Sequence, residues 1–226
     1  MSGGARPEEL VGVVLAGGLS SRMGEHKPAL RLCEGMPDLL SRTIALLRSC
    51  TAEVWVSCRQ GQTVPDCRCI HDFEEGLGPI GGIVSALTAL VQSPRQAALV
   101  LSCDLPFMHE DTLARLIHAR RGVQSGALMT TFRQTETGYI EALTAIYEKE
   151  ALPFFEQALA AGLRQINLAL RPDQRTEVLY SRREALPFFN INYPADLEMA
   201  RQLIASFGCV TGGKGASGSA SGTATT

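Results

Sequence analysis

The sequence predicts an α/β fold in which helices cover both faces of a mostly parallel central sheet. Short apolar runs rich in β-branched residues, such as VGVVLA (11–16) and AALVLSCD (97–104), alternate along the chain with segments of helical periodicity. Strands that alternate with helices are joined by crossover connections, which give a parallel sheet between two layers of helices. The chain of 226 residues is long enough to bury the core of one such domain.

The first half of the chain begins with a predicted buried strand at 11–16, which is continuous, β-branched and stopped by Gly17. A helix is expected at 38–49, where apolar residues recur at helical spacing and Asp38 is of a type that caps helices. The next elements are two strands and a helix that opens at glycines: EVWVSC (53–58), CRCIHD (67–72) and 81–92.

The second half begins with the most apolar strand of the chain, 97–104, which ends on a carboxylate. The expected helix at 109–121 has acidic residues at its start and basic residues at its end, as the helix dipole favours. Apolar patterning predicts the remaining elements, which are strands at 126–132, 141–147 and 175–180 and helices at 149–161, 165–170 and 194–207.

We expect these elements to form one domain, residues 1–210, followed by a tail. The tail, residues 211–226, reads TGGKGASGSASGTATT and contains no aromatic side chain and no apolar side chain larger than alanine. A segment of this composition cannot bury enough apolar surface to offset the entropy of ordering its backbone, so it is predicted to be disordered.

Composition excludes several classes of partner. The net charge of −2 gives no general attraction to nucleic acid, whose binding proteins usually present a basic face. No apolar run approaches the roughly 18 residues of a membrane span, and the first residues, MSGGARPEEL, lack the apolar centre of a signal peptide. We therefore expect a cytoplasmic protein with neither a nucleic acid nor a membrane as partner.

The seven cysteines are scattered, odd in number and without a CxxC pair. This pattern argues against a disulfide framework and against a structural zinc site. Cys67 and Cys69 would lie on one side of a strand, but buried thiols are the favoured interpretation.

The segment LAGGLSSRMGEHKPAL (15–30) indicates an anion-binding loop at the end of the first strand. Adjacent glycines let the backbone turn sharply or approach a ligand, and Arg22 and Lys27 supply positive charge. The spacing fits neither the G-x-G-x-x-G fingerprint nor a P-loop that ends in Gly-Lys-Ser/Thr. A tight turn with solvated charges is the alternative for this segment taken alone.

Two aspartates end strands that point toward the same edge of the expected sheet. In open parallel sheets, ligands bind beyond the carboxyl ends of the strands. Asp104 ends the most apolar strand, and because Mg²⁺ takes one or two carboxylates together with substrate phosphate, Asp104 is the candidate metal ligand. For Asp72 a contact with nucleobase, ribose or metal-bound water and a structural role at the start of the following helix both stay open.

Four segments together resemble a known family. The pattern L-A-G-G-x-S-x-R-M-G-x-x-K resembles nucleotidyltransferases that activate small phosphorylated molecules with a nucleoside triphosphate. Three more segments follow in order: HDFEEGLGPIGGI (71–83), LSCDLPF (101–107) and FFNINYPADL (188–197). Over roughly residues 11–207 the chain resembles the molybdenum cofactor guanylyltransferases. The resemblance implies a three-layer Rossmann-like nucleotidyltransferase fold and Mg²⁺-dependent transfer of GMP from GTP to the terminal phosphate of molybdopterin, with release of pyrophosphate.

The resemblance also implies roles for individual residues. Backbone amides of a glycine loop can cradle the triphosphate, and Arg22 and Lys27 would stabilise the leaving pyrophosphate. Arg22, Lys27 and Asp104 are the expected catalytic residues, and Asp104 is the expected metal ligand. Expected nucleotide-binding residues are Leu15, Ala16, Gly17, Gly18, Arg22, Lys27, Asp72, Gly81 and Asp104. Asn190, Asn192 and Arg182 are the expected pterin-binding residues. Molybdoenzymes or cofactor chaperones are possible transient partners.

Two alternatives to guanylyl transfer stay open. One is a cytidylyltransferase acting on the same pterin, although relatives of that kind tend to carry Ala-Ala-Gly where this chain has Ala16, Gly17 and Gly18. The other is a nucleotide- or cofactor-binding chaperone without turnover, which the presence of Asp104 and the loop's basic residues disfavours. Arg59 stands where the family often has Asn, so one base or ribose contact differs.

Overall fold

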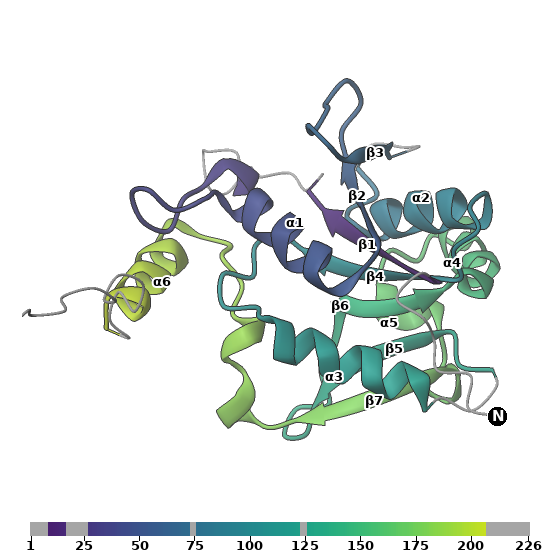
Figure 1. Ribbon diagram of the computed structural model, residues 1–226. Helices are drawn as coiled ribbons and strands as arrows, with labels where there is room; N and C mark the ends of the chain where they lie inside the picture. Colours follow the sequence, from purple (N-terminus) through teal and green to yellow (C-terminus); the bar gives the residue numbers. More distant parts are fainter. Residues whose placement is uncertain (1–8, 17–26, 73–75, 123–125, 207–226) are drawn as a thin grey trace, which may run out of the picture.

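The structure, a computed structural model, describes residues 9–16, 27–72, 76–122 and 126–206 of the chain. Within these residues a seven-stranded sheet has the order β3-β2-β1-β4-β6-β5-β7, as Figure 1 shows. The strands are β1 (Leu10–Leu15), β2 (Glu53–Cys58), β3 (Arg68–His71), β4 (Ala97–Ser102), β5 (Met129–Gln134), β6 (Ile140–Glu148) and β7 (Arg175–Tyr180). β6 runs antiparallel to β4 and β5, and the other neighbouring pairs are parallel. The predicted mostly parallel sheet is confirmed.

Helices cover both faces of this sheet. One apolar cluster joins it to α1 (Leu39–Cys50) and α3 (Glu110–Arg121). A second cluster joins the opposite face to α2 (Pro79–Val91), α4 (Leu152–Ala160) and α5 (Ile166–Ala169). The alternation of side chains along a strand explains the division, since Val11 and Val13 of β1 lie in the second cluster and Val14 lies in the first. The predicted three-layer arrangement is confirmed.

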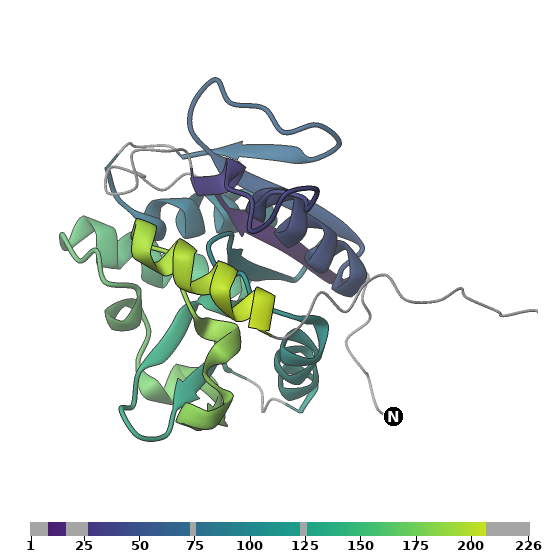
Figure 2. The same ribbon diagram turned by 90° about the vertical axis from the view of Figure 1, so that its left-hand side faces the viewer.

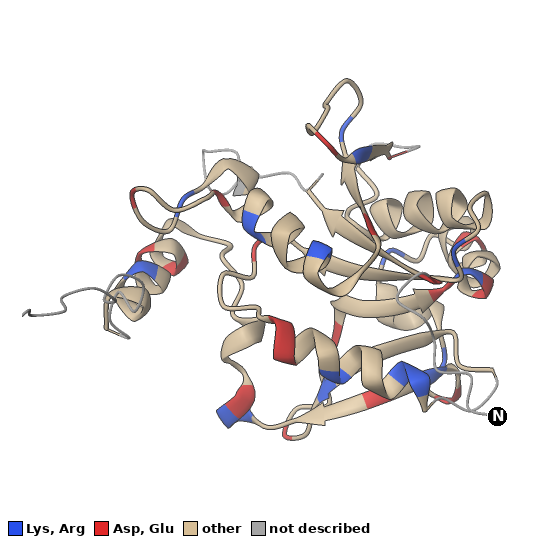
Figure 3. Cartoon of the chain, viewed as in Figure 1, with Lys and Arg blue, Asp and Glu red and all other residues tan. Residues whose placement is uncertain are grey.

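Helix ends agree with the local sequence chemistry. The Asp38 carboxylate accepts the Ser41 N–H at 2.7 Å, so the predicted cap of α1 is confirmed. In α3, acidic residues occupy the first turn and basic residues the last (Figure 3). Gly12 of β1 lets α1 pack closely, because a Cβ there would lie 3.0 Å from the Leu47 Cβ.

Two predicted boundaries are displaced in ways that affect the site. α2 begins at Pro79 rather than at Gly81, because proline suits the first turn of a helix and Gly78 supplies the left-handed cap with φ +71°. Gly81 and Gly82 therefore lie inside the helix. β4 ends at Ser102, so Asp104 lies in the turn after the strand rather than on the strand itself.

The carboxyl ends of β1, β2, β3 and β4 meet at one edge of the sheet, which we call the carboxyl edge. The last helix, α6 (Pro194–Ser206), crosses in front of the strands when the molecule is viewed from this side (Figure 2). Its Leu197 and Ala200 pack with Leu30, Leu32 and Leu39 in a third small cluster. No helix among the described residues is long and apolar enough to cross a membrane.

Candidate active site

Three residues in register form the floor of the candidate site. Leu15 of β1 pairs with Ser57 of β2 on one side and with Ser102 of β4 on the other. Residues paired in this way project from the same face of the sheet, here the face covered by α2, where Leu15 packs against the core. We call this set the Ser57–Leu15–Ser102 row. Both serines are almost completely buried.

Ala16, the last described residue before the glycines, follows β1 directly. The Ala16 N–H donates to the Ser57 carbonyl at 2.9 Å, which fixes the direction of the chain at the point where the loop begins. Gly17, Gly18 and Arg22 lie outside the described residues. The described residues resume at Lys27, which begins a short 3₁₀ turn that ends at Ala29.

Hydrogen bonds from Ser102 and Ile191 hold Asp104 beside the row. The Ser102 hydroxyl donates to its Oδ1 at 2.6 Å, and its carbonyl accepts the Ile191 N–H at 3.0 Å. The second contact joins segments far apart in the sequence. It brings the expected pterin-binding segment, Asn190 to Asn192, to the expected metal ligand.

Asp72 lies on the other side of the row, immediately after β3. Its Oδ1 accepts the Ser57 hydroxyl at 3.0 Å. Burial raises the pKa of the Asp72 carboxyl above its ordinary value, while the Ser57 hydrogen bond and the nearby His71 oppose that rise. A half-buried carboxyl that still receives a hydroxyl donor is suited to binding a further N–H or O–H group.

The asparagines differ in their surroundings. The Oδ1 atom of Asn190 is buried and has no hydrogen-bond partner among the described residues. Because buried polar atoms are normally satisfied, this acceptor is suited to an N–H group of a ligand. Ile191 is fully buried, whereas Asn192 is exposed and its backbone N–H donates to the Asp196 carboxylate at 2.8 Å.

Arg182 is not brought to this group of residues. It begins a short 3₁₀ turn after β7, is exposed, and its backbone N–H donates to Glu136 at 3.1 Å. That bond is the main reason why the pKa of the Glu136 carboxyl lies below its ordinary value. β7 is three strands from β4, a separation of about 14 Å.

Gly81 is buried in the first turn of α2, where its N–H donates to the Gly78 carbonyl at 3.1 Å. A Cβ at this position would lie 3.0 Å from the Leu77 Cβ, a tight contact that favours glycine. Its neighbour Gly82, which the sequence analysis did not select, faces the Ser57–Leu15–Ser102 row. Ser57 and Ser102 were also missed, although a lone hydroxyl near the end of an apolar strand was a usable signal.

The donor set at Asp104 fits Mg²⁺ better than a metal with several protein ligands. The described residues contain no group of three or more His, Cys, Asp or Glu side chains that could hold a metal ion. Mg²⁺ commonly binds through one or two carboxylates and takes its other ligands from substrate phosphate and water. None of the six described cysteines forms a disulfide, and burial raises the pKa of the Cys58 thiol to about 12.

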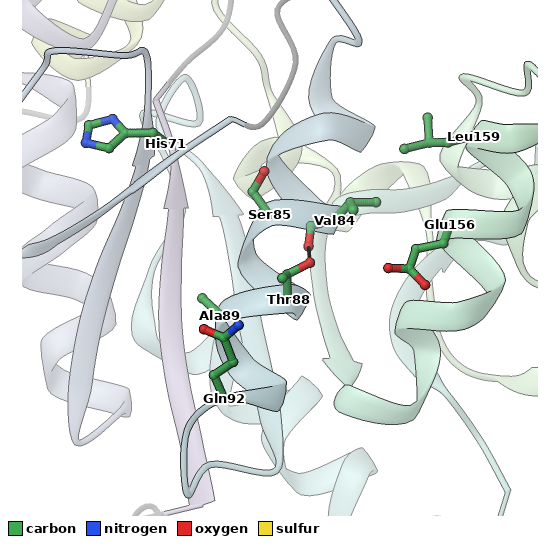
Figure 4. A pocket seen from close by; sticks show the side chains of 8 residues that line it. All are labelled: His71, Val84, Ser85, Thr88, Ala89, Gln92, Glu156 and Leu159. Carbon is green, nitrogen blue, oxygen red and sulfur yellow. Dashed lines mark hydrogen bonds between the residues drawn. The ribbon is translucent and has the colours of Figure 1, made fainter.

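A pocket of about 600 Å³ lies on the outer side of α2, between β3 and α4 (Figure 4). It is lined by His71, Val84, Ser85, Thr88, Ala89, Gln92, Glu156 and Leu159. None of the Ser57–Leu15–Ser102 row, Asp72 or Asp104 lines it, so we locate the candidate site at the carboxyl edge, where the polar groups converge.

The sheet order and the aspartates at the carboxyl edge fit the class of α/β nucleotidyltransferases. The chain belongs to the family described as the MobA-like NTP transferase domain, which matches residues 12–176. The predicted family membership is confirmed, and with it the class of enzyme.

Relatives and solved structures agree with this assignment. A probable molybdenum cofactor guanylyltransferase of Chloroflexus aggregans is 33% identical over 199 residues, covering 84% of this chain and 92% of the relative. One of Mycobacterium tuberculosis is 28% identical over 195 residues, covering 85% and 94%. The crystal structure of molybdopterin-guanine dinucleotide biosynthesis protein A from Archaeoglobus fulgidus has a TM-score of 0.69 at 25% identity, covering 87% of this chain and 99% of that one. A cytidylyltransferase from Thermus thermophilus shares the fold, with a TM-score of 0.61 at 19% identity over 85% of this chain and 98% of that one.

Proposed function

We propose that this chain transfers GMP from GTP to the terminal phosphate of molybdopterin and releases pyrophosphate. The hydrogen bond between Ile191 and the Asp104 carbonyl carries the proposal, because it sets the candidate acceptor-binding segment against the candidate metal ligand. The names of the relatives support guanine as the base and molybdopterin as the acceptor. The product then passes to a molybdoenzyme or cofactor chaperone in the cytoplasm, with no nucleic acid or membrane involved.

In this proposal the protein contributes positioning and charge rather than a base. The terminal phosphate of molybdopterin has a second pKa of about 6 and is largely dianionic at neutral pH, so it attacks the α-phosphorus without losing a proton. Asp104 holds Mg²⁺, which when bound supplies positive charge at the phosphate oxygens. Arg22 and Lys27 stabilise the pyrophosphate that leaves, and the amides of residues 16–18 orient the triphosphate.

The asparagine segment binds the acceptor. The buried Oδ1 of Asn190 accepts an N–H of the pterin, and Asn192 adds neutral donors that bring no further negative charge near Asp104. Arg182 reaches the acceptor only if the ligand spans several strands, so its contribution is the smallest of the three.

The test is turnover with each nucleotide in turn. Purified protein, Mg²⁺ and molybdopterin are incubated with GTP, CTP, ATP or UTP, and pyrophosphate and the dinucleotide product are measured. We expect release with GTP and little with the other three. Preference for CTP would replace the base assignment, and nucleotide binding without pyrophosphate release would favour the chaperone. Omission of Mg²⁺ should abolish turnover.

A further inference from the structure

Ser57, Gly82 and Asp72 form one closely packed unit at the carboxyl edge. The Ser57 hydroxyl of β2 donates to the Asp72 Oδ1 at 3.0 Å. Gly82 of α2 faces the same hydroxyl, since a Cβ on Gly82 would lie 2.8 Å from the Ser57 Oγ and 3.6 Å from the Asp72 Oδ1. It would also lie 3.1 Å from the Leu15 Cδ2. A side chain at position 82 would therefore displace the Ser57 hydroxyl that holds Asp72.

The hydroxyl of Ser57 is 1% exposed and lies in a strand whose other central residues, Val54, Trp55 and Val56, are apolar and buried. Burying a hydroxyl in such surroundings is unfavourable unless it is hydrogen-bonded. A serine hydroxyl has one proton to donate, and here that proton is directed to Asp72. The bond fixes the Oδ1 oxygen of the Asp72 carboxylate.

We propose that Ser57 is a positioning residue for nucleotide binding: it anchors one oxygen of Asp72, in space that Gly82 provides, so that the other oxygen accepts an N–H or O–H of the nucleoside. This inference rests on the proposed function for the identity of the nucleotide. The structural part of it, anchoring of Asp72 by Ser57 in space left by Gly82, does not.

The charges around Asp72 leave Ser57 as its principal support among the described residues. His71 of β3 lies near Asp72 and favours its ionised form. The Cys58 thiol of β2 is also near enough for the Asp72 charge to raise its pKa. The residue of α2 that faces Asp72 is the uncharged Gly82. Burial raises the pKa of Asp72, and the Ser57 hydroxyl opposes that rise. Loss of the hydroxyl should therefore raise the pKa further.

The first test is Ser57→Ala, which removes the hydroxyl and preserves the packing. We expect KM for GTP to rise about tenfold, because the carboxylate is no longer held in place, with kcat changed less than threefold. The matched control is Thr43→Val, which removes a hydroxyl that is 6% exposed and donates to the Leu39 carbonyl within α1. It should leave both constants unchanged. If Ser57→Ala and Thr43→Val changed kcat and KM by the same factors, the positioning role would be overturned.

Nucleotide analogues then separate the two possible donors. ITP lacks the exocyclic amine of guanine, and 2′-deoxy-GTP lacks one ribose hydroxyl. If Asp72 contacts the base, Ser57→Ala and wild type should differ little with ITP but differ fully with 2′-deoxy-GTP. The reverse pattern assigns the ribose. A full tenfold difference with both analogues would exclude the exocyclic amine and the 2′-hydroxyl, and would assign the contact to the base N1–H or the ribose 3′-hydroxyl.

The second test needs no turnover. Gly82→Ala should destabilise the protein, and Ser57→Ala should reduce that loss because it removes the atom 2.8 Å from the new Cβ. The carboxyl pKa of Asp72, followed by ¹³C NMR, should rise in Ser57→Ala and stay unchanged in Thr43→Val. Additive stabilities with an unmoved pKa would refute the anchoring. If both effects appear while GTP is not a substrate, the proposed function fails and the anchoring stands.

Discussion

The two edges of the sheet hold their acidic side chains in different ways. At the amino edge, where β4 begins and β6 ends, the Glu148 carboxylate accepts two hydrogen bonds from the Arg120 guanidinium, one at each oxygen, at 2.6 and 2.8 Å. At the carboxyl edge, Asp72 and Asp104 each accept the hydroxyl of a buried serine, at 3.0 and 2.6 Å.

The difference matches the structural role expected of Glu148 and the functional roles proposed for Asp72 and Asp104. A guanidinium neutralises a carboxylate and occupies both of its oxygens, so the Glu148 pair adds stability and leaves little capacity for a ligand. A serine hydroxyl binds one oxygen and adds no charge. A carboxylate held in this way keeps the negative charge that a metal ion or a nucleoside donor requires.

The largest expected effect comes from the carboxyl edge. Asp104→Asn keeps an oxygen that can accept the Ser102 hydroxyl but removes the charge proposed to hold Mg²⁺, so we expect turnover to fall about 100-fold or more. The melting temperature should change little, because the backbone contact to Ile191 is retained. Asp111→Asn, on the exposed first turn of α3, is the matched control and should keep its activity. Normal turnover of the Asp104 variant would transfer the metal assignment to Asp72.

The complementary change is at the amino edge. Glu148→Gln leaves the Arg120 side chain, which is 11% exposed, without its ionic partner. Removing one member of such a pair should lower the free energy of unfolding by about 2 kcal/mol, less than for a fully enclosed pair. Denaturant titration measures this loss. Position 148 is about 23 Å along the strands from Asp104, so kcat of the folded enzyme should not change, and a parallel fall in kcat would contradict the separation of roles.

The effect of Asp72 on stability is smaller and depends on pH. The pKa of Asp72 is raised by burial above its ordinary value of 3.8, so the folded state holds its proton more tightly than the unfolded state does. The stabilising contribution of the Asp72 carboxyl is therefore fully present below pH 3.8. It is lost as the pH rises through the pKa of the folded state. Asp72→Asn removes that loss, so its melting temperature at pH 7 should exceed that of wild type by about 1–2 °C.

This difference should vanish below pH 4, because wild-type Asp72 is then protonated too. KM for nucleotide should rise in the same variant, which makes Asp72 a residue that lowers stability and supports binding. Asp173→Asn is the control of opposite sign, because a hydrogen bond from Arg171 lowers the pKa of Asp173. It should not raise the melting temperature. A destabilised Asp72→Asn protein at pH 7 would show that the carboxylate has a structural role.

Local chemistry was predictable from the sequence, and long-range pairing was not. The Asp38 cap and the alternation of strands and helices follow from residue type and spacing over a few positions. The insertion of β6 between β4 and β5 depends on which strand packs best against β4, and no short pattern encodes that choice. The start of α2 was placed two residues late because the glycines were given more weight than Pro79 and Gly78.

The site shows the same division. Asp104 was identifiable because a carboxylate at the end of an apolar strand has a direct physical meaning. The adjacency of Asp104 and Ile191 depends on the path of the chain after β7, which spacing does not determine. Ser57 acquires its role only when Asp72 of the next strand and Gly82 of α2 are brought against it.

The smallest expected effect concerns residues 211–226, which lie outside the described residues. α6 crosses in front of the carboxyl edge and ends at Ser206. The small polar residues of 211–226 cannot recover the roughly 1–2 kcal/mol per residue needed to fix a backbone. A chain that ends at Val210 should therefore match the full chain in melting temperature and in kcat/KM. A several-fold loss of kcat/KM at an unchanged melting temperature would show that the segment completes the site. The carboxyl edge would then owe its function to residues 211–226 as well as to the aspartates held by serines.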